Sequence, residues 1–360
     1  GGNTVSTYTY SAGPGMLPKE VMQEIQQHLL TFEYEGVSII ETSHRSEAFQ
    51  QVVDSLEARL RRLMHIPENY AVLWLQGGAT LQFSMIPMNL RIRNRFAYVD
   101  TGIWSKKAMD DARHFGQVDV IHPLIDEAGG MSFEPSLARD VDYLHVTLNN
   151  TIEGTRFTTI PETDVPLIAD ASSNILAEQI DVERFGMIYA GAQKNIGPAG
   201  LTVVIIRRDL IQSIELPSYL HYGSHVDTLF NTPSTFSMYA AERVLKWVED
   251  QGGVEAMERL NREKSETVYS FLEQSNVFSP LVSGERRSLT NIPFTTGDRN
   301  RDKGFQQFAL ERGLLELGGH RSVGGLRASL YNAMPTEGAV RLVDVMRAFE
   351  EENHVSHQNI

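Results

Sequence analysis

Among the seven lysines of the chain, Lys194 has the surroundings that best suit covalent chemistry. It follows an apolar run and stands among small residues, in Tyr189-Ala190-Gly191-Ala192-Gln193-Lys194-Asn195-Ile196-Gly197-Pro198-Ala199-Gly200. Small neighbours let a planar ligand approach the backbone, and a partly desolvated amine has a lowered pKa and attacks aldehydes. A strand-end lysine that simply reaches solvent is the alternative. The other six are expected in charged or helical surface contexts: Lys19, Lys106, Lys107, Lys246, Lys264 and Lys303.

Asp170 ends the preceding apolar run, residues 165–170, so it too is expected at the carboxyl end of a strand. A buried carboxylate needs a partner, and a protonated pyridine nitrogen would be one. Such an ion pair keeps pyridoxal phosphate (PLP) cationic, so that it can accept electrons from a substrate Cα. Capping of a following helix is the alternative role. Together, Asp170 and Lys194 favour a PLP site in which both are candidate catalytic residues.

A phosphate group would need a cup of backbone donors, and the segment Gln76-Gly77-Gly78-Ala79-Thr80 offers one. It lies between a predicted strand and a predicted helix, where N–H groups bind phosphate, and Thr80 adds a hydroxyl. A plain glycine-rich turn is the alternative. Because neither dinucleotide-binding nor P-loop glycine motifs occur, those two classes lose support. Trp104 follows another predicted strand and is a candidate to stack on a pyridine ring, although tryptophan is also a common core residue.

Cationic side chains form three groups, His44-Arg45, His320-Arg321 and Arg327. Arginine grips carboxylate and phosphate with a fork of donors, so several arginines predict a substrate with more than one anionic group. Surface arginine is the alternative, but Arg327 lies inside the apolar run 326–330. The 11 histidines show no metal-ligand spacing, and no metal site is expected.

Composition excludes several function classes. The formal net charge of the 360-residue chain is −14, which disfavours nucleic acid and anionic membranes as partners. The absence of cysteine excludes disulfides, thiolate nucleophiles and cysteine-based metal sites. No apolar run reaches the ~18 residues that a membrane span requires, and residues 1–4 lack a secretory pattern. A cytoplasmic location is therefore expected.

The elements that position these groups alternate between strands and helices up to about residue 251. Strands are expected at 71–75, 96–100, 118–122, 143–147, 165–170, 187–190 and 201–207, and helices at 17–30, 47–64, from 105, and at 237–251. This pattern predicts an α/β fold, with a mainly parallel sheet covered by helices and ligands beyond the carboxyl strand ends.

After a helix at 254–273, the pattern changes to strands at 289–295 and 325–331 and helices at 302–312 and 336–350. A smaller α+β C-terminal domain is therefore expected, with a boundary near 255–265. We assign residues 16–258 to a large cofactor-binding domain, and residues 259–360, with the N-terminal segment 1–15, to the small domain.

Taken together, the motifs resemble those of the phosphoserine aminotransferase family, whose members are class-V, fold-type-I PLP enzymes. The resemblance runs nearly end to end. Its most specific parts are residues 75–83, 189–200, 230–236 and 319–333, with shorter matches at 11–18 and 43–46.

The resemblance implies roles for individual residues. The lysine matching Lys194 bonds to the cofactor, the aspartate matching Asp170 pairs with the pyridine nitrogen, and the tryptophan matching Trp104 stacks on the ring. Four further cofactor contacts are implied at Ala79, Thr80, Thr151 and Gln193. Asn231 and Thr232 match residues that reach the cofactor phosphate from the other subunit, which implies an obligate homodimer.

The resemblance also implies how anionic substrates are bound. Arg45 and Arg327 match substrate carboxylate ligands. The phosphate-binding set falls on His44, His320 and Arg321. Some family members carry arginine where this chain has Thr80, so an equal affinity for the substrate phosphate does not follow.

The implied reaction is transamination between O-phosphoserine or 3-phosphohydroxypyruvate and 2-oxoglutarate or glutamate, in serine biosynthesis. Whether 4-phosphohydroxythreonine of vitamin B6 biosynthesis is also a substrate stays open. One alternative is a serine– or alanine–glyoxylate aminotransferase, which would not need the His320-Arg321 pair. Another is an anion-binding or nicotinamide protein without PLP on the same type of sheet. A cysteine desulfurase is excluded, because its persulfide requires a cysteine.

Overall fold

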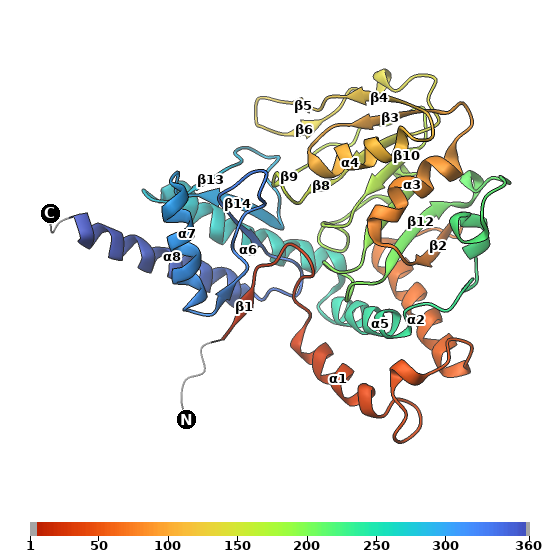
Figure 1. Cartoon of the computed structure of the whole chain (residues 1–360), viewed down its shortest axis with the longest axis horizontal. Coiled ribbons are helices and arrows are strands. Elements are labelled where there is room, and N and C mark those ends of the chain that lie inside the picture. The colour runs from red at the N-terminus through yellow and green to blue at the C-terminus, as the bar shows by residue number, and fades with distance from the viewer. Residues whose placement is uncertain (1–5, 358–360) are drawn as a thin grey trace.

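A seven-stranded sheet forms the centre of the broad part of the molecule (Figure 1), in a computed structural model that describes residues 6–357. In spatial order its strands are β2 (Tyr70–Leu75), β12 (Thr202–Arg207), β11 (Met187–Gly191), β10 (Leu167–Asp170), β7 (Leu144–Thr147), β3 (Arg95–Val99) and β4 (Gln117–Ile121). Only the two pairs that include β12 are antiparallel, so the predicted mainly parallel sheet is confirmed. Residues 192–201 alone join β11 to β12, and a parallel pair would need a longer crossover connection.

Helices cover both faces of this sheet. One face packs against α2 (Glu47–Met64) and α5 (Thr235–Asp250), with α1 (Lys19–Leu30) outside α5. The other face packs against α3 (Gly78–Leu90) and α4 (Ile103–Ala112). Because side chains alternate along a strand, Ala190 belongs to the first apolar cluster and Tyr189 to the second.

A narrower part of the molecule follows α5 (Figure 1). It contains α6 (Gly253–Gln274), β13 (Ser279–Pro280), β14 (Asn291–Thr295), α7 (Arg299–Leu310), β15 (Leu314–Leu315), β16 (Leu326–Ser329) and α8 (Thr336–His357). Strands β13, β14 and β16 form an antiparallel sheet, and β1 (Tyr8–Thr9) pairs with β15. This part has an apolar cluster of its own, which Val268 of α6 joins, whereas Val254 of the same helix belongs to the large cluster.

Short elements complete the described chain. The remaining strands are β5 (Leu124–Ile125), β6 (Met131–Ser132), β8 (Asn149–Asn150) and β9 (Thr155–Arg156). The 3-10 helices are η1 (Ile39–Glu41), η2 (Pro135–Leu137), η3 (Val182–Arg184), η4 (Arg208–Leu210), η5 (Ser218–Leu220) and η6 (Tyr222–His225). Within residues 6–357, no helix combines the length and the apolar character that a membrane span requires.

Local sequence signals explain where the helices begin. Ser46 caps α2 by accepting a hydrogen bond from the N–H of Phe49, and the expected helix 47–64 is confirmed. The helix expected at 302–312 begins earlier, at Arg299, because the side chain of Asp298 accepts from the N–H of Arg301 and caps the preceding turn.

Lys264 contradicts the expectation that it lies in a surface context. It is 2% exposed, and its Nζ donates to the carbonyl oxygens of Tyr331 at 2.9 Å and Met334 at 2.8 Å. Burial lowers the pKa of Lys264 to about 7. The charged neighbours in the sequence mislead, because a helix turns about 100° per residue and Lys264 shares its buried stripe with Asn261 and Val268.

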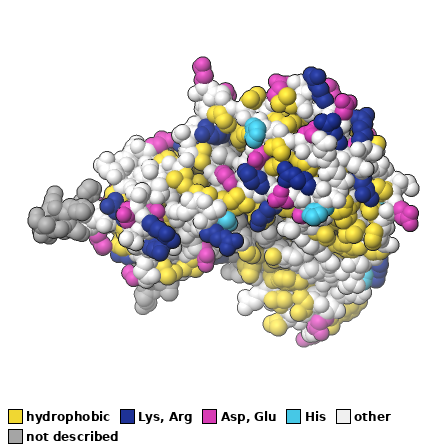
Figure 2. Space-filling view, turned by 45° about the horizontal axis from the view of Figure 1, so that its top comes forward, with side chains coloured by type: hydrophobic (Ala, Val, Ile, Leu, Met, Phe, Trp, Pro, Cys, Tyr) yellow, Lys and Arg dark blue, Asp and Glu magenta, His cyan; other side chains and the backbone are white. Residues whose placement is uncertain are grey.

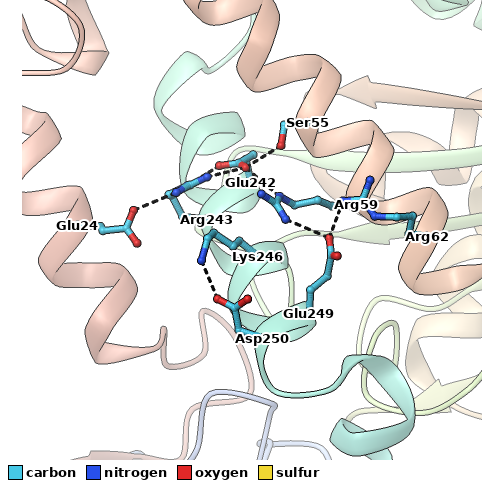
Figure 3. Close-up of polar contacts among 9 residues, drawn as sticks. All are labelled: Glu24, Ser55, Arg59, Arg62, Glu242, Arg243, Lys246, Glu249 and Asp250. Carbon is cyan, nitrogen blue, oxygen red and sulfur yellow. Dashed lines mark hydrogen bonds and ion pairs between the residues drawn. The ribbon is translucent and has the colours of Figure 1, made fainter.

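Three helices of the broad part are joined by a network of charges around Glu242 (Figure 3). The side chain of Glu242 is 4% exposed, and it accepts hydrogen bonds from Ser55 at 2.9 Å and from Nε of Arg59 at 3.0 Å. Its chain neighbour Arg243 also donates to it, at 2.7 Å, and pairs with Glu24 of α1 at 3.2 Å. The network therefore ties α1 and α2 to α5.

Burial on its own would raise the pKa of Glu242. The hydrogen bonds and charge of Arg243, with smaller contributions from Ser55 and Arg59, outweigh burial and hold that pKa below its usual value. The ionised carboxylate is therefore stabilising in the folded state. Its contribution is present above about pH 4.5 and is lost as the pH falls through the lower folded-state pKa.

We expect Glu242→Ala to lower the free energy of unfolding by about 3 kcal/mol at pH 7, because two arginines lose a buried counter-charge. The difference from the unsubstituted protein should shrink as the pH falls below about 4. Urea unfolding at several pH values measures it. Asp250→Ala is the control, since it breaks the exposed pair with Lys246 and should cost well under about 1 kcal/mol. Equal losses in both variants would contradict the stabilising role of the buried network.

Candidate active site

The carboxyl ends of β10 and β11 bring Asp170 and Lys194 to one edge of the sheet. The two strands are parallel neighbours, with Asp170 opposite Tyr189, and Lys194 follows the end of β11 by three residues. The two side chains are close enough for each charge to affect the pKa of the other. This is the edge at which parallel sheets bind ligands.

Lys194 is half-buried, and its Nζ donates a hydrogen bond to Oγ1 of Thr151 at 2.8 Å. Burial lowers the pKa of Lys194 to about 8; Asp170 opposes that change and Arg327 adds to it. The N-terminal segment packs closely against this lysine, since a Cβ at Gly13 would lie 3.4 Å from its Cε. At pH 7, about a tenth of this amine is therefore uncharged and nucleophilic, far more than for a lysine in water.

Asp170 is 7% exposed, and its Oδ1 accepts a hydrogen bond from the N–H of Ser172 at 2.9 Å. Burial raises the pKa of Asp170, whereas Ser172, Lys194 and the hydroxyl of Tyr189 act to lower it. Behind this carboxylate, the Tyr189 hydroxyl lies 2.7 Å from Nε2 of His145, whose pKa burial lowers to about 3. Neutral polar groups thus support the buried carboxylate.

Ser172 and Tyr189 as partners of Asp170, and His145 as the partner of Tyr189, were not predicted from the sequence. The sequence does contain a pattern that indicates such partners, because His145 and Tyr189 are polar residues within otherwise apolar runs. In a strand whose other residues are buried, such side chains need a hydrogen-bonding partner.

Trp104 is the second residue of α4 and is half-buried. Its ring lies 6.3 Å from that of Phe83, and Nζ of Lys107 lies 4.6 Å from its centre. Glu153 fixes the start of α4, since its Oε2 accepts a hydrogen bond from the N–H of Ile103 at 3.2 Å. No sequence pattern indicates this role of Glu153, which binds the N–H of the residue before Trp104.

The glycine-rich turn continues directly into α3, as expected. Gly77 caps the helix with a φ of 94°, a left-handed conformation that favours glycine. Ala79 and Thr80 lie in the first turn, where backbone N–H groups have no intrahelical acceptor. Gln193 is half-buried beside Lys194. The turn can therefore present N–H donors to an anion.

The narrower part contributes cations. Arg327 lies on β16 and is half-buried; its charge lowers the pKa of Lys194, and the charge of Glu153 acts on Arg327 itself. Burial lowers the pKa of His320, and the charges of Arg327, Arg321 and Lys107 lower it further. His320 therefore lies near Arg327, and Arg321 follows it in the chain. On the face shown in Figure 2, Lys, Arg and His side chains gather where the two parts of the molecule meet.

His44 and Arg45 do not join this group within one chain. They line a separate cavity of about 300 Å³ with Trp74 and Asp227, and Arg45 donates to the carbonyl of Leu229 at 3.2 Å.

Asn231 and Thr232 are exposed, and they follow Leu229, which lines the cavity of His44 and Arg45. Nδ2 of Asn231 donates to Oε1 of Gln76 at 3.4 Å, and Nε2 of Gln76 donates to the carbonyl of Thr232 at 3.2 Å. Both residues thus lie beside the glycine-rich turn and face outward.

The residues around Lys194 fit PLP. The buried carboxylate of Asp170 has no hydrogen bond from a lysine or arginine among the described residues, and it matches a pyridinium nitrogen. The hydroxyl of Thr147, opposite Asp170 on β7, is buried and unpartnered within residues 6–357. An amine for the aldehyde, an indole for the ring and a helix N-terminus for the phosphate complete the match.

The chain matches the family model described as aminotransferase class V over residues 7–342. It is 86% identical to a phosphoserine aminotransferase of Exiguobacterium sp., over 356 residues that cover 99% of this chain and 100% of that one. It is 50% identical to a phosphoserine aminotransferase of Listeria monocytogenes, with 95% and 96% covered.

Solved structures agree. Phosphoserine aminotransferase from Bacillus circulans subsp. alkalophilus superposes with a TM-score of 0.91 at 40% identity, covering 97% of this chain and 99% of that chain. PLP-bound phosphoserine aminotransferase from Trichomonas vaginalis gives 0.88 at 36% identity, covering 95% and 100%. An alanine–glyoxylate aminotransferase from Nostoc sp. gives 0.77 at 17% identity, covering 96% and 95%, a likeness of fold alone. The expected PLP fold type I is thereby confirmed, and so is PLP as the cofactor.

We expect Lys194 to react with a small aldehyde at a rate that rises with pH and levels off above about pH 8, because only the neutral amine is nucleophilic. Reductive labelling of the cofactor-free protein followed by peptide mapping measures this rate. The exposed Lys303 of α7 is the internal control, because its amine lies in water and is not desolvated. Identical pH profiles for the two lysines would contradict a desolvated Lys194.

Proposed function

The chain belongs to aminotransferase class V and, within it, to the phosphoserine aminotransferases, and we propose that it transfers an amino group between glutamate and 3-phosphohydroxypyruvate, yielding 2-oxoglutarate and O-phosphoserine for serine biosynthesis. The observation that carries this function is the pairing of a desolvated amine and a buried carboxylate at one sheet edge, with cations alongside. The proposed location is the cytoplasm, as suits an enzyme of small soluble metabolites.

PLP, when bound, supplies an aldehyde that bonds amines and a cationic ring that withdraws electrons from a substrate Cα. Lys194 would hold the cofactor at rest. The free Nζ of Lys194 would take the proton from the substrate Cα, which a pKa of about 8 allows near neutral pH. The carboxylate of Asp170 would pair with the ring nitrogen and favour its protonated form.

The other cofactor contacts hold the ring and its phosphate. Trp104 would stack on the ring, and Glu153 accepts a hydrogen bond at the start of the helix that carries Trp104. Thr151, the hydrogen-bond partner of Lys194, would place a hydroxyl near the reacting atoms. Ala79 and Thr80 at the N-terminus of α3, with Gln193 from the Lys194 loop, would hold the phosphate.

Substrate anions are bound by two groups of cations. Arg327 binds a carboxylate, and its half-buried position supports this role because a guanidinium there needs an anionic partner. His320 and Arg321 bind the phosphate of the substrate. Arg45 binds a carboxylate and His44 a phosphate, although both lie apart from Lys194 within one chain.

A homodimer would explain why His44 and Arg45 lie apart from Lys194 within one chain. We propose that Asn231 and Thr232 reach the cofactor phosphate of the partner subunit, because both are exposed and face outward beside the glycine-rich turn. His44 and Arg45 lie close to the same segment, so the same contact can carry them to the partner's substrate.

We also propose the division into a large domain of residues 16–258 and a small domain of residues 259–360 with the segment 1–15. The separate apolar clusters support it, as does the pairing of β1 with β15, which places the N-terminal segment against the small domain. Residues 1–5 lie outside the described chain.

Mixing two inactive variants tests the shared site. In a dimer of Lys194→Ala with the double variant Asn231→Ala/Thr232→Ala, one of the two sites combines an intact lysine with intact partner residues. We expect a random mixture of the two chains to recover roughly a quarter of full activity, since half of the dimers are mixed. Each variant alone should remain inactive. If mixing restores nothing, both residues act within their own chain.

A coupled transamination assay with 3-phosphohydroxypyruvate and glutamate tests the reaction itself. We expect Arg321→Ala to lower kcat/KM for O-phosphoserine by about 10- to 100-fold, because a charge-assisted hydrogen bond to phosphate is lost, while turnover of unphosphorylated serine hardly changes. Arg299→Ala, an exposed arginine of α7, is the control and should leave both unchanged. Equal losses for the two substrates would contradict phosphate binding by Arg321.

A further inference from the structure

A cluster of four buried polar residues joins the two parts of the molecule directly behind Lys194. It consists of Asn195, Asn261, Lys264 and Asn332, none more than 7% exposed, and we call it the Asn332 cluster. Asn195 follows Lys194 in the chain, Asn261 and Lys264 belong to α6, and Asn332 lies in the turn between β16 and α8. Burying four such side chains is costly unless their polar groups are paired.

Asn332 is the centre of these bonds. Its backbone N–H donates to Oδ1 of Asn195 at 3.0 Å, and its Nδ2 donates to the carbonyl of Leu176 at 2.9 Å. Its Oδ1 accepts from Nδ2 of Asn261 at 2.8 Å, and that same Nδ2 also donates to the carbonyl of Ala177 at 2.9 Å. A single residue of the turn is therefore bound to the Lys194 loop, to the segment after β10 and to α6.

Lys264 holds the same turn from the other side. Its Nζ donates to the carbonyls of Tyr331 and Met334, on either side of Asn332. Within residues 6–357 it has no carboxylate partner, and the two carbonyls accept its hydrogen bonds. Burying an amine without a counter-charge costs desolvation free energy, so it adds little to the stability of the fold.

The turn is connected to the substrate-facing strand. Arg327 lies on β16, four residues before Tyr331. Tyr331 is fixed in turn, because its hydroxyl donates to the carbonyl of Ala12 at 2.6 Å and accepts from Nδ2 of Asn291 at 3.1 Å. Lys194 and Arg327 come from different parts of the molecule, and the Asn332 cluster is one hydrogen-bonded path between the loop of Lys194 and the strand of Arg327.

We propose that Asn332 and Lys264 are positioning residues that set the separation between Arg327 and Lys194. The inference rests on the proposed function, in which Arg327 binds a substrate carboxylate. A substrate held by that carboxylate must present its Cα to Nζ of Lys194, so the span between the two side chains decides whether the proton can be taken. No residue of the cluster is among the proposed cofactor or substrate contacts, so the cluster acts through Asn195 and the turn.

The test uses the PLP-loaded enzyme with Lys264→Met and Asn332→Ala. Lys264→Met keeps the apolar stem and removes both hydrogen bonds to the turn. Tyr269→Phe is the matched control, because it removes one buried hydrogen bond of the same helix, to the carbonyl of Ser288, without touching the turn. The measurements are Tm, the PLP dissociation constant of the cofactor-free protein, KM and kcat for glutamate, and the dissociation constant of glutarate, an unreactive dicarboxylate, by calorimetry.

We expect both cluster variants to weaken glutarate binding and raise KM for glutamate by about 10-fold or more, since a displacement near 1 Å costs that much in a positioned site. The PLP dissociation constant should stay within about 2-fold, because the cofactor contacts lie on the large part of the molecule. Tyr269→Phe should lower Tm and leave glutarate binding unchanged.

Two results separate this inference from the proposed function. If the unsubstituted enzyme does not transaminate glutamate, or Arg327→Ala leaves glutarate binding unchanged, the proposed function fails, and the inference with it. If the enzyme is active and Arg327→Ala weakens glutarate binding, but Lys264→Met and Asn332→Ala only lower Tm as Tyr269→Phe does, the cluster is structural and the inference is overturned.

Discussion

The burial of an amine and a carboxylate beside each other is the constraint on which the structure depends. Each group on its own is costly to remove from water, and each lowers that cost for the other. The parallel pairing of β10 and β11 puts Asp170 next to the loop of Lys194, and Ser172 and Tyr189 supply the hydrogen bonds that a buried carboxylate requires. Around this pair, the helices, the glycine-rich turn and the cations of the narrower part supply the other groups of the candidate site.

Local patterns predicted the elements well, because a single face of each helix and the strand interiors are apolar. The helix 47–64 and the order of strands and helices were predictable from periodicity alone. The antiparallel direction of β12 could not be predicted from periodicity. It depends on the length of the connection after β11 and on which strand edges are still unpaired. Lys264 was predicted wrongly, because its charged sequence neighbours point away from the stripe that it shares with Asn261.

Some residues of the candidate site could likewise be predicted from the sequence, and others could not. Lys194, Asp170, Thr151 and the Arg327 group come together as their positions at strand ends and in the apolar run 326–330 indicate. Glu153 and His145 were missed, because their partners, a helix start and a tyrosine hydroxyl, are distant in the sequence. His44 and Arg45 lie elsewhere in the single chain, and no local pattern indicates which surface another subunit would cover.

Helix α6 belongs to both apolar clusters, with Val254 at one end and Val268 at the other. Helix α6 is therefore packed into both parts and is not a linker between them. A change in the angle between the parts would bend α6, which weakens its backbone hydrogen bonds, or would pull one end out of its apolar cluster, which loses buried contacts. The exposed residues 321–324 lie outside this packing, so a change in their conformation would not carry that cost.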